Sequence, residues 1–318
     1  MTEEERKKFY SDLNLLYESG DPCSIENFLT SRAAFYAEVK GGLNDAYLVC
    51  LSELGAYYRG QSRYEEALEM FRRAEAVIIP LFGDTSLEYA VNLNNMAGAW
   101  RMAGETGRAL ELFLNAARVF ESLDTKNAYV YASILNNMSL LYQFLGDYEK
   151  AVHYMTVSIE HLESVPEAGN ELATAYSNLS FQLNRRGEKE KSIKMLDKSI
   201  ALFRALGDRG DHYAAALNSR GVLTAEQGRH EDARTIFLEA LSILKEKLGE
   251  NADYGTTCRN MARALAMSGD FGEAVNYMRQ ALEIFRRVFG DDHEAVQSAA
   301  RELNEMKKLF RGIKPHDQ

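Results

Sequence analysis

The chain has 318 residues, of which 46% are hydrophobic, and a formal net charge of −10 at pH 7. This hydrophobic content is sufficient for a packed core. The net negative charge argues against nonspecific binding to nucleic acid or to an anionic membrane, because both need a basic protein surface. Three widely spaced cysteines and the lack of any signal-peptide-like or membrane-spanning apolar run lead us to expect a cytoplasmic protein without a disulfide framework.

The first 42 residues predict a helical pair that caps the N-terminus. Two amphipathic segments, 2–19 and 24–40, are separated by Gly20-Asp21-Pro22, and Ser24 is the expected N-cap of the second helix. Their apolar positions match the later copies only loosely. Terminal repeats are usually atypical because one of their faces meets water, so we interpret 1–42 as a cap.

From residue 43 to 290 the chain repeats a helix–turn–helix unit six times. Each second helix has a small residue near its start, which we use as a marker. The turn lies five residues before this marker, with Ser62 in the first copy and glycine in the other five. Further small residues lie twelve positions before and seven positions after the marker. Small side chains at these positions let the helix axes approach closely. That marker recurs every 41 or 42 residues, at Ala67, Ala109, Ala151, Ser192, Ala233 and Ala274.

The last helix is predicted over residues 291–312, where apolar residues recur at helical spacing. No second helix follows it, so we interpret it as the C-terminal cap. Residues 313–318 are expected to form a disordered tail. Together these segments predict a single domain that spans residues 1–318.

The third copy carries a known repeat pattern. It reads Leu135-x2-Met138-Ser139-x2-Tyr142 and then Ala151-x3-Met155, and this resembles the tetratricopeptide repeat over about residues 44–290. The long period, the LNN triplets at 93–95 and 135–137 and linkers such as LFGD resemble the kinesin-light-chain type. The resemblance implies an all-α superhelix, a solenoid of about seven helix pairs plus a C-terminal capping helix. Arg220 departs from the pattern because a large apolar residue is expected there, which leaves either local looseness or an internal ion pair.

The resemblance also implies that residues opposite the buried stripe of each first helix line a concave groove. Asparagine recurs there. A carboxamide both donates and accepts hydrogen bonds, which suits the backbone of an extended peptide. The alternative is that these amides bridge neighbouring helices and serve the fold alone. The residues concerned are Asn94, Asn95, Asn136, Asn137, Asn178, Asn218 and Asn260.

The same groove positions hold five arginines against two acids, Glu53 and Glu226, although the protein as a whole is acidic. Arginine binds carboxylates with two parallel hydrogen bonds, which predicts an acidic or C-terminal peptide as partner. The alternative is that each arginine pairs with its own neighbours. The Lys/Asn carboxylate clamp of chaperone-binding members is not reproduced. The arginines are Arg59, Arg101, Arg185, Arg259 and Arg263.

Four apolar residues, Met102, Leu140, Phe144 and Phe181, occupy groove positions midway along the chain. An exposed cluster of this kind would anchor a partner side chain, whereas aromatic residues at helical spacing commonly belong to the core. Both interpretations are left open by the sequence.

Catalytic chemistry is not indicated. The six histidines are scattered, and the chain holds no HExxH, CxxC, GxSxG or P-loop motif, so we expect no enzyme activity, cofactor or metal site. The favoured function is a protein- or peptide-binding adaptor with a groove lined by asparagine and arginine. One alternative is a structural scaffold that self-associates, for example as a homodimer, without a peptide ligand. Another is a peptide-responsive bacterial regulator, although we see no DNA-binding helix-turn-helix appended to the repeats that would support it.

Overall fold

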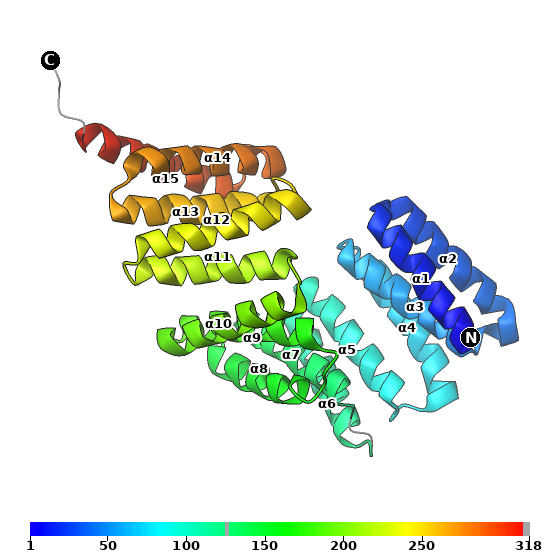
Figure 1. The fold of residues 1–318 in the computed structure, drawn as a ribbon. Coiled ribbons are helices and arrows are strands. Elements are labelled where there is room, and N and C mark those ends of the chain that lie inside the picture. The colour runs from blue at the N-terminus through cyan, green and yellow to red at the C-terminus, as the bar shows by residue number, and fades with distance from the viewer. Residues whose placement is uncertain (125–126, 314–318) are drawn as a thin grey trace. The chain divides into compact units, whose positions relative to one another are not determined.

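The computed structural model describes residues 1–124 and 127–313, and these residues form fifteen α-helices, one short 3₁₀ helix and no strand (Figure 1). The predicted all-α class is confirmed, as are seven helix pairs followed by one capping helix. The chain packs as two compact units, Met1–His161 and Leu162–Gln318, and each is described on its own below. None of the described helices is both long enough and apolar enough to cross a membrane.

Unit 1 holds the predicted N-terminal cap and the first three repeat copies. Successive helices lie side by side and run in opposite directions (Figure 1). Its elements are α1 (Glu3–Ser19), α2 (Pro22–Glu38), the 3₁₀ helix η1 (Val39–Gly42), α3 (Asp45–Gly60), α4 (Tyr64–Phe82), α5 (Leu87–Met102), α6 (Thr106–Glu121), α7 (Ala128–Phe144) and α8 (Tyr148–Leu162), whose last residue falls at the boundary.

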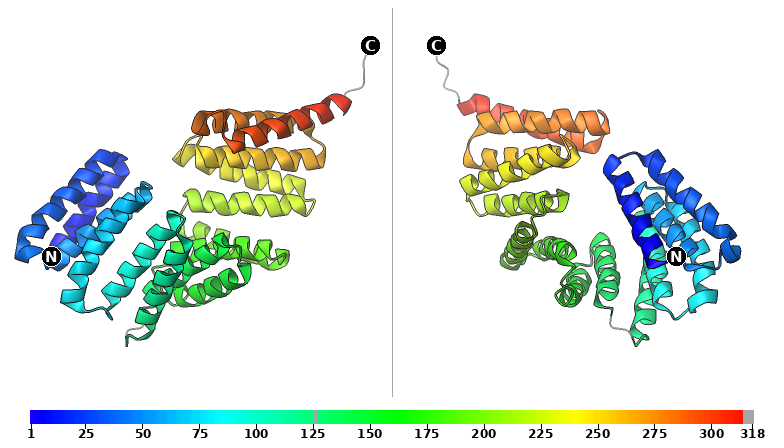
Figure 2. Two further views of the ribbon diagram at one scale, coloured as in Figure 1. Left: turned by 180° about the vertical axis from the view of Figure 1, so that it is seen from behind. Right: turned by 45° about the vertical axis from the view of Figure 1, so that its right-hand side comes forward.

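Unit 2 holds the last three copies and the C-terminal capping helix. Helices α11 to α14 stack as layers in both views of Figure 2. The expected tail lies outside the described residues, except for Ile313, with which α15 ends. The helices are α9 (Gly169–Arg185), α10 (Lys189–Leu206), α11 (Asp211–Glu226), α12 (His230–Lys247), α13 (Ala252–Ser268), α14 (Phe271–Phe289) and α15 (Glu294–Ile313).

The start of α2 differs from the sequence-based expectation. The helix begins at Pro22, and its N-cap is Asp21, whose carboxylate accepts a hydrogen bond from the Cys23 amide at 3.1 Å. Ser24 lies inside the first turn and donates its hydroxyl hydrogen to the same carboxylate. Proline suits the first helical position because it has no amide hydrogen to satisfy there, and this explains the earlier start.

The turns between paired helices follow the prediction. Each first helix ends at a residue with positive φ: Ser62 has φ 60°, and the five glycines have φ between 77° and 88°. The next residue donates its amide hydrogen back into the last helical turn, as in Asp147 N to Tyr142 O at 3.0 Å. Glycine adopts this backbone conformation without strain, and the returning bond satisfies an otherwise unpaired carbonyl.

Small residues allow the helices of a pair to approach closely. Every marker residue named above is fully buried, from Ala67 to Ala274. Where the small residue is serine, the proximity supports a hydrogen bond between helices. Ser139 Oγ donates to Ala151 O at 2.7 Å, and Ser158 Oγ donates to Ala132 O at 2.8 Å. These two bonds join α7 to α8 and satisfy hydroxyls that burial would otherwise leave unpaired.

Arg220 forms an internal ion pair. Its Nε donates to Asp197 Oδ1 at 2.8 Å, and its Nη1 donates to the hydroxyl of Thr224 at 2.6 Å. The side chain is 14% exposed. The threonine that replaces the usual aromatic residue at 224 thus partners the arginine that replaces the usual apolar residue at 220, so the two departures from the repeat pattern compensate each other.

Candidate functional site: the inner faces of the two units

First helices of successive pairs contact one another, α3 with α5 and α5 with α7 in unit 1, and α11 with α13 in unit 2. We define the inner face of each unit by the predicted groove residues on its first helices. In unit 1 these are Arg59, Asn94, Asn95, Arg101, Asn136, Asn137, Leu140 and Phe144, and in unit 2 they are Asn178, Phe181, Arg185, Asn218, Arg259, Asn260 and Arg263.

Arg59 of α3 and Arg101 of α5 form a cation pair without an acid. Among the described residues, neither guanidinium forms an ion pair or a hydrogen bond, and Arg101 Nε is buried without a partner. Gly98 provides the space for Arg59, since a Cβ at residue 98 would lie 3.0 Å from Arg59 Nη1. Buried polar groups are normally satisfied, so Arg101 Nε is a donor that the described residues leave without an acceptor.

Electrostatics point the same way. Burial lowers the pKa of Arg59 below its usual range, and the neighbouring Arg101 lowers it further. Burial likewise lowers the pKa of Arg101. Two partly desolvated like charges destabilise the fold, and a planar guanidinium is a donor group that matches a carboxylate.

The two inner-face arginines of α13 are in the opposite situation. Arg259 Nε donates to Glu302 Oε1 at 3.0 Å, and Arg263 Nε donates to Glu302 Oε2 at 2.8 Å. This carboxylate of α15 thus neutralises both arginines inside the chain. Arg185 on α9 is exposed. The arginines that the sequence grouped together therefore divide into an unpaired pair in unit 1 and a paired set in unit 2.

Sequence reasoning missed Glu302, although a signal for it exists. When α15 is aligned as a seventh first helix, Asn304 falls at the small-residue position, and Glu302 falls at the position of Asn95, Asn137 and Asn260. The carboxylate thus occupies an inner-face position of the capping helix, from which it reaches the arginines of the preceding first helix.

Glu302 gives unit 2 a specific sensitivity to acid. Burial alone would raise its pKa, but hydrogen bonds from Arg263 and Arg259 hold the pKa at about 2, below the ordinary value of 4.5. A lowered carboxyl pKa stabilises the fold above the ordinary pKa, and this contribution is lost as the pH falls from 4.5 toward 2. We expect Glu302→Gln to lower stability at neutral pH and to flatten the loss of stability across that window. Urea unfolding at several pH values measures both effects.

The control for this prediction is Glu305→Gln, a substitution on the exposed side of the same helix. It should leave both neutral-pH stability and its pH dependence near those of the wild type. Parallel pH profiles for the wild type and Glu302→Gln would show that this ion pair contributes no stability.

The asparagines also divide into separate groups. Asn137 Nδ2 donates to Asn94 Oδ1 at 3.0 Å, and Asn260 Nδ2 donates to Asn218 Oδ1 at 3.1 Å. For these four residues, the amides bridge first helices of neighbouring copies. Among the described residues, Asn178 makes no such bond, and Asn95 lines a cavity on the inner face of unit 1.

Replacing Asn137 by alanine should lower stability, whereas replacing Asn178 should not. Asn94 is 7% exposed, so removal of its partner leaves a buried carbonyl oxygen unsatisfied, at a cost of about 1–3 kcal/mol. At Asn178 the better helix propensity of alanine should offset whatever is lost. Thermal unfolding of the two single variants measures the difference, and equal melting temperatures would contradict the bridging role of Asn137.

The apolar groove residues are largely accessible. Phe144 is 67% exposed and Phe181 is 49% exposed, so neither ring belongs to the core. Met102 is also exposed, and Leu140 is half-buried. Met102, Leu140 and Phe144 lie in unit 1 with the unpaired arginines, whereas Phe181 lies in unit 2. Unit 1 therefore combines accessible apolar side chains with two cations that have no acidic partner among the described residues.

Comparison with known families gives a consistent match. A model described as "Tetratricopeptide repeat" matches residues 47–122, 88–164 and 171–246, and a second model with the same description matches residues 255–295. Together the matched segments cover most of the repeated region, residues 43–290. No curated protein sequence gives a significant match to the chain.

Solved structures with low sequence identity share the fold. BtubC (BKLC) from P. vanneervenii is 16% identical with a TM-score of 0.56, over 84% of this chain and 95% of that chain. A Rap protein complexed with Competence and Sporulation Factor is 14% identical with a TM-score of 0.60, over 96% of this chain and 85% of that chain. At these identities the likeness establishes the helical-repeat architecture and nothing about ligands.

Proposed function

Because this chain belongs to the tetratricopeptide repeat family, we propose that it is a non-enzymatic adaptor that holds a peptide segment of another protein. Repeats of this kind form protein-interaction modules, and the inner face of unit 1 carries the guanidiniums of Arg59 and Arg101, of which Arg101 Nε is buried without a partner. The proposed ligand is an extended peptide that is acidic or ends in a free carboxylate, bound on the inner face of unit 1.

The observation that carries this proposal is the Arg59–Arg101 pair. Both guanidiniums are partly desolvated and pair with no acid in the part of the chain that the structure describes, and Arg101 Nε is buried and unsatisfied. Retaining such a pair weakens the unliganded fold, which is understandable if a ligand supplies the missing negative charge. Each charge-assisted hydrogen bond to a carboxylate contributes about 1.5–3 kcal/mol.

Neighbouring residues suit the rest of a peptide. Asn95 and Asn136 are half-buried on the adjacent turns of α5 and α7, where their amides can pair with an extended backbone. The exposed ring of Phe144 offers an apolar contact. The Rap protein of similar fold was solved as a complex with Competence and Sporulation Factor, which illustrates that this architecture accommodates a bound factor.

A series of fluorescein-labelled peptides tests the proposal. The series pairs acidic peptides ending in Asp-Glu with Asn-Gln counterparts, each with a free or an amidated C-terminus. We expect fluorescence polarisation to show binding that requires negative charge and weakens with added salt, because the anion is held by arginine. Equal binding of the charged and uncharged peptides would contradict the proposal. A salt-insensitive dimer that binds no peptide of the series would instead favour the self-associating scaffold.

A further inference from the structure

We propose that a cavity between α3 and α5 takes an uncharged apolar side chain of the bound peptide, about three residues away from the carboxylate that the arginines of unit 1 hold. This inference rests on the proposed peptide function and adds a second requirement to its ligand. The cavity has a volume of about 330 Å³, which lies within the range of ligand pockets. Apolar side chains of α3, α4 and α5 form most of its wall: Leu48, Val49, Ile78, Phe82, Leu87 and Val91.

We call the contact between two successive first helices a seam, and the seam between α3 and α5 lacks an amide bridge that later seams have. Ser52 and Asn95 occupy its bridge positions, and among the described residues no hydrogen bond joins these two side chains. Both residues are half-buried and line the cavity, which therefore reaches the inner face without a bridge across it. The bridges of the other seams are Asn94 with Asn137 and Asn218 with Asn260.

The cavity and the arginine pair lie at different levels along α5. The cavity wall on this helix includes Val91, and Arg59 Nη1 lies beside Gly98, seven residues further along the chain. A helix rises by about 1.5 Å per residue, so these two levels are about 10 Å apart. An extended peptide advances by about 3.3 Å per residue. About three residues therefore separate the carboxylate from the side chain that enters the cavity.

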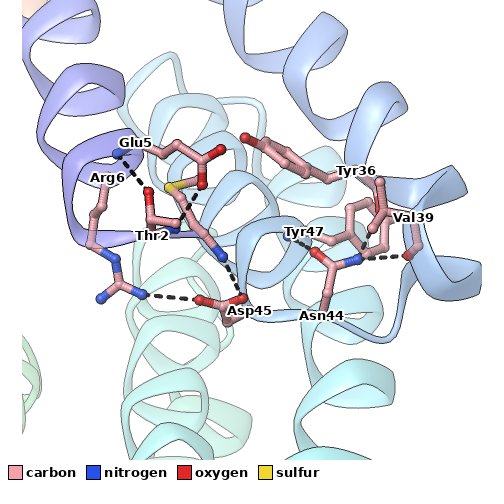
Figure 3. Close-up of polar contacts among 9 residues, drawn as sticks. Thr2, Glu5, Arg6, Tyr36, Val39, Asn44, Asp45 and Tyr47 are labelled. Atoms are coloured by element: carbon pink, nitrogen blue, oxygen red, sulfur yellow. Dashed lines mark hydrogen bonds and ion pairs between the residues drawn. The ribbon is translucent and has the colours of Figure 1, made fainter.

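Charges around the cavity favour an uncharged side chain. Asp45 accepts a hydrogen bond from the N-terminal ammonium at 2.9 Å and pairs with Arg6, so these lining residues neutralise each other within the chain (Figure 3). Glu88 also lines the cavity, and no cation pairs with it among the described residues. Because Glu88 repels a carboxylate, the acidic residue of the peptide is directed to the arginines and a neutral residue to the cavity.

The equivalent crevice of unit 2 differs in size, wall and bridge. It lies between α11 and α13 at the same repeat positions, and its volume is about 210 Å³. Ala215 and Thr256 stand in place of Val49 and Val91. An amide bridge joins the two helices of this seam. The apolar side chain of the peptide should therefore select the cavity of unit 1.

The test adds a single leucine to the acidic peptide of the series above. In a serine background, the leucine is placed at each position from one to six residues before the Asp-Glu end, and fluorescence polarisation gives the affinity of each peptide for the full chain. We expect leucine about three residues from the acidic end to bind about tenfold or more tightly than the serine parent, because burial of a leucine side chain contributes at least that factor. Equal affinity for every leucine position would overturn the proposal.

Ser52→Asn is the matched variant, because it places asparagine where two other seams have it. We expect the new amide to bridge to Asn95 and to remove the advantage of the leucine peptide, while the serine parent binds as before. Ser177→Asn changes the equivalent position of α9 in unit 2 and should alter neither affinity. An undiminished advantage of leucine in Ser52→Asn would contradict an open seam as the entrance. If this variant fails to fold, the leucine scan of the wild type still decides the proposal.

Failure of this inference is distinguishable from failure of the proposed function. If the serine parent binds through its negative charge but leucine adds nothing at any position, the cavity is excluded and the arginine site stands. If binding requires leucine but not the negative charge, the arginine site is excluded, and the spacing derived from it is excluded as well. If no peptide of the series binds, both proposals are overturned.

Discussion

Replacing Arg59 and Arg101 together by methionine should weaken binding of the acidic peptides about 100-fold or more, while it raises the stability of the free protein. The loss follows from two charge-assisted hydrogen bonds, each worth about 1.5–3 kcal/mol, since about 2.7 kcal/mol corresponds to a factor of 100. The gain in stability follows because both cations are partly desolvated and have no acidic partner among residues 1–124 and 127–313. Fluorescence polarisation and thermal unfolding of the same variant measure the two effects.

The matched control exchanges the arginines of unit 2. Arg259→Met with Arg263→Met should leave peptide affinity unchanged and should lower stability, because Glu302 loses both of its partners. We therefore expect the unit 1 variant to be more stable than the wild type and to bind the peptide weakly. The unit 2 variant should be less stable and should bind the peptide normally. Loss of peptide affinity in the unit 2 variant, with full affinity in the unit 1 variant, would place the anion site on unit 2 and contradict the proposal.

Gly55→Ala should destabilise unit 1 by about 1–3 kcal/mol, the usual cost of overpacking a core. A Cβ on residue 55 would lie 2.4 Å from the ring of Phe71, which is fully buried, so the ring or the helix must shift. The melting temperature should fall by several degrees. Urea unfolding of the variant measures the change in free energy.

Gly60→Ala in the same helix is the control, since a Cβ on residue 60 would meet no atom within 4 Å. Its stability should equal or slightly exceed that of the wild type, because alanine is the better helix former. Phe71→Leu should partly rescue Gly55→Ala, since the fourth copy pairs the larger Ser180 with Leu196 at these positions. Equal stability of the two single glycine variants would show that α3 and α4 adjust freely.

The repeat architecture was predictable because it depends on local and periodic features. The turn glycines, the fully buried markers such as Ala109, and the small residues at contact points each act within one helix pair. The second helix differs from the prediction at both ends: its N-cap is Asp21 rather than Ser24, and it ends at Glu38, where a 3₁₀ helix follows. For Arg220 the sequence left two outcomes open, local looseness or an internal ion pair, and the structure shows the ion pair with Asp197.

The state of the inner-face side chains was not predictable in the same way. Asn137 pairs with Asn94, 43 positions away, and Arg259 pairs with Glu302, also 43 positions away. One copy of the repeat separates each pair, so composition alone cannot tell which side chain has a partner. The cavity that Asn92 lines likewise depends on four helices together, α1, α3, α4 and α5. Periodicity places a residue on the inner face, but packing between copies decides whether it is satisfied.

The most direct test of the central claim observes the arginine side chains themselves. Arginine Nε–Hε signals, recorded by NMR while the acidic Asp-Glu peptide is added, report which guanidinium receives the carboxylate. We expect the Arg101 Nε–Hε signal to shift strongly and saturably, the Arg59 signal to shift with it, and the signals of Arg259 and Arg263 to stay in place. Shifts confined to Arg259 and Arg263, or none at Arg101 when the peptide is bound, would contradict an anion site on unit 1.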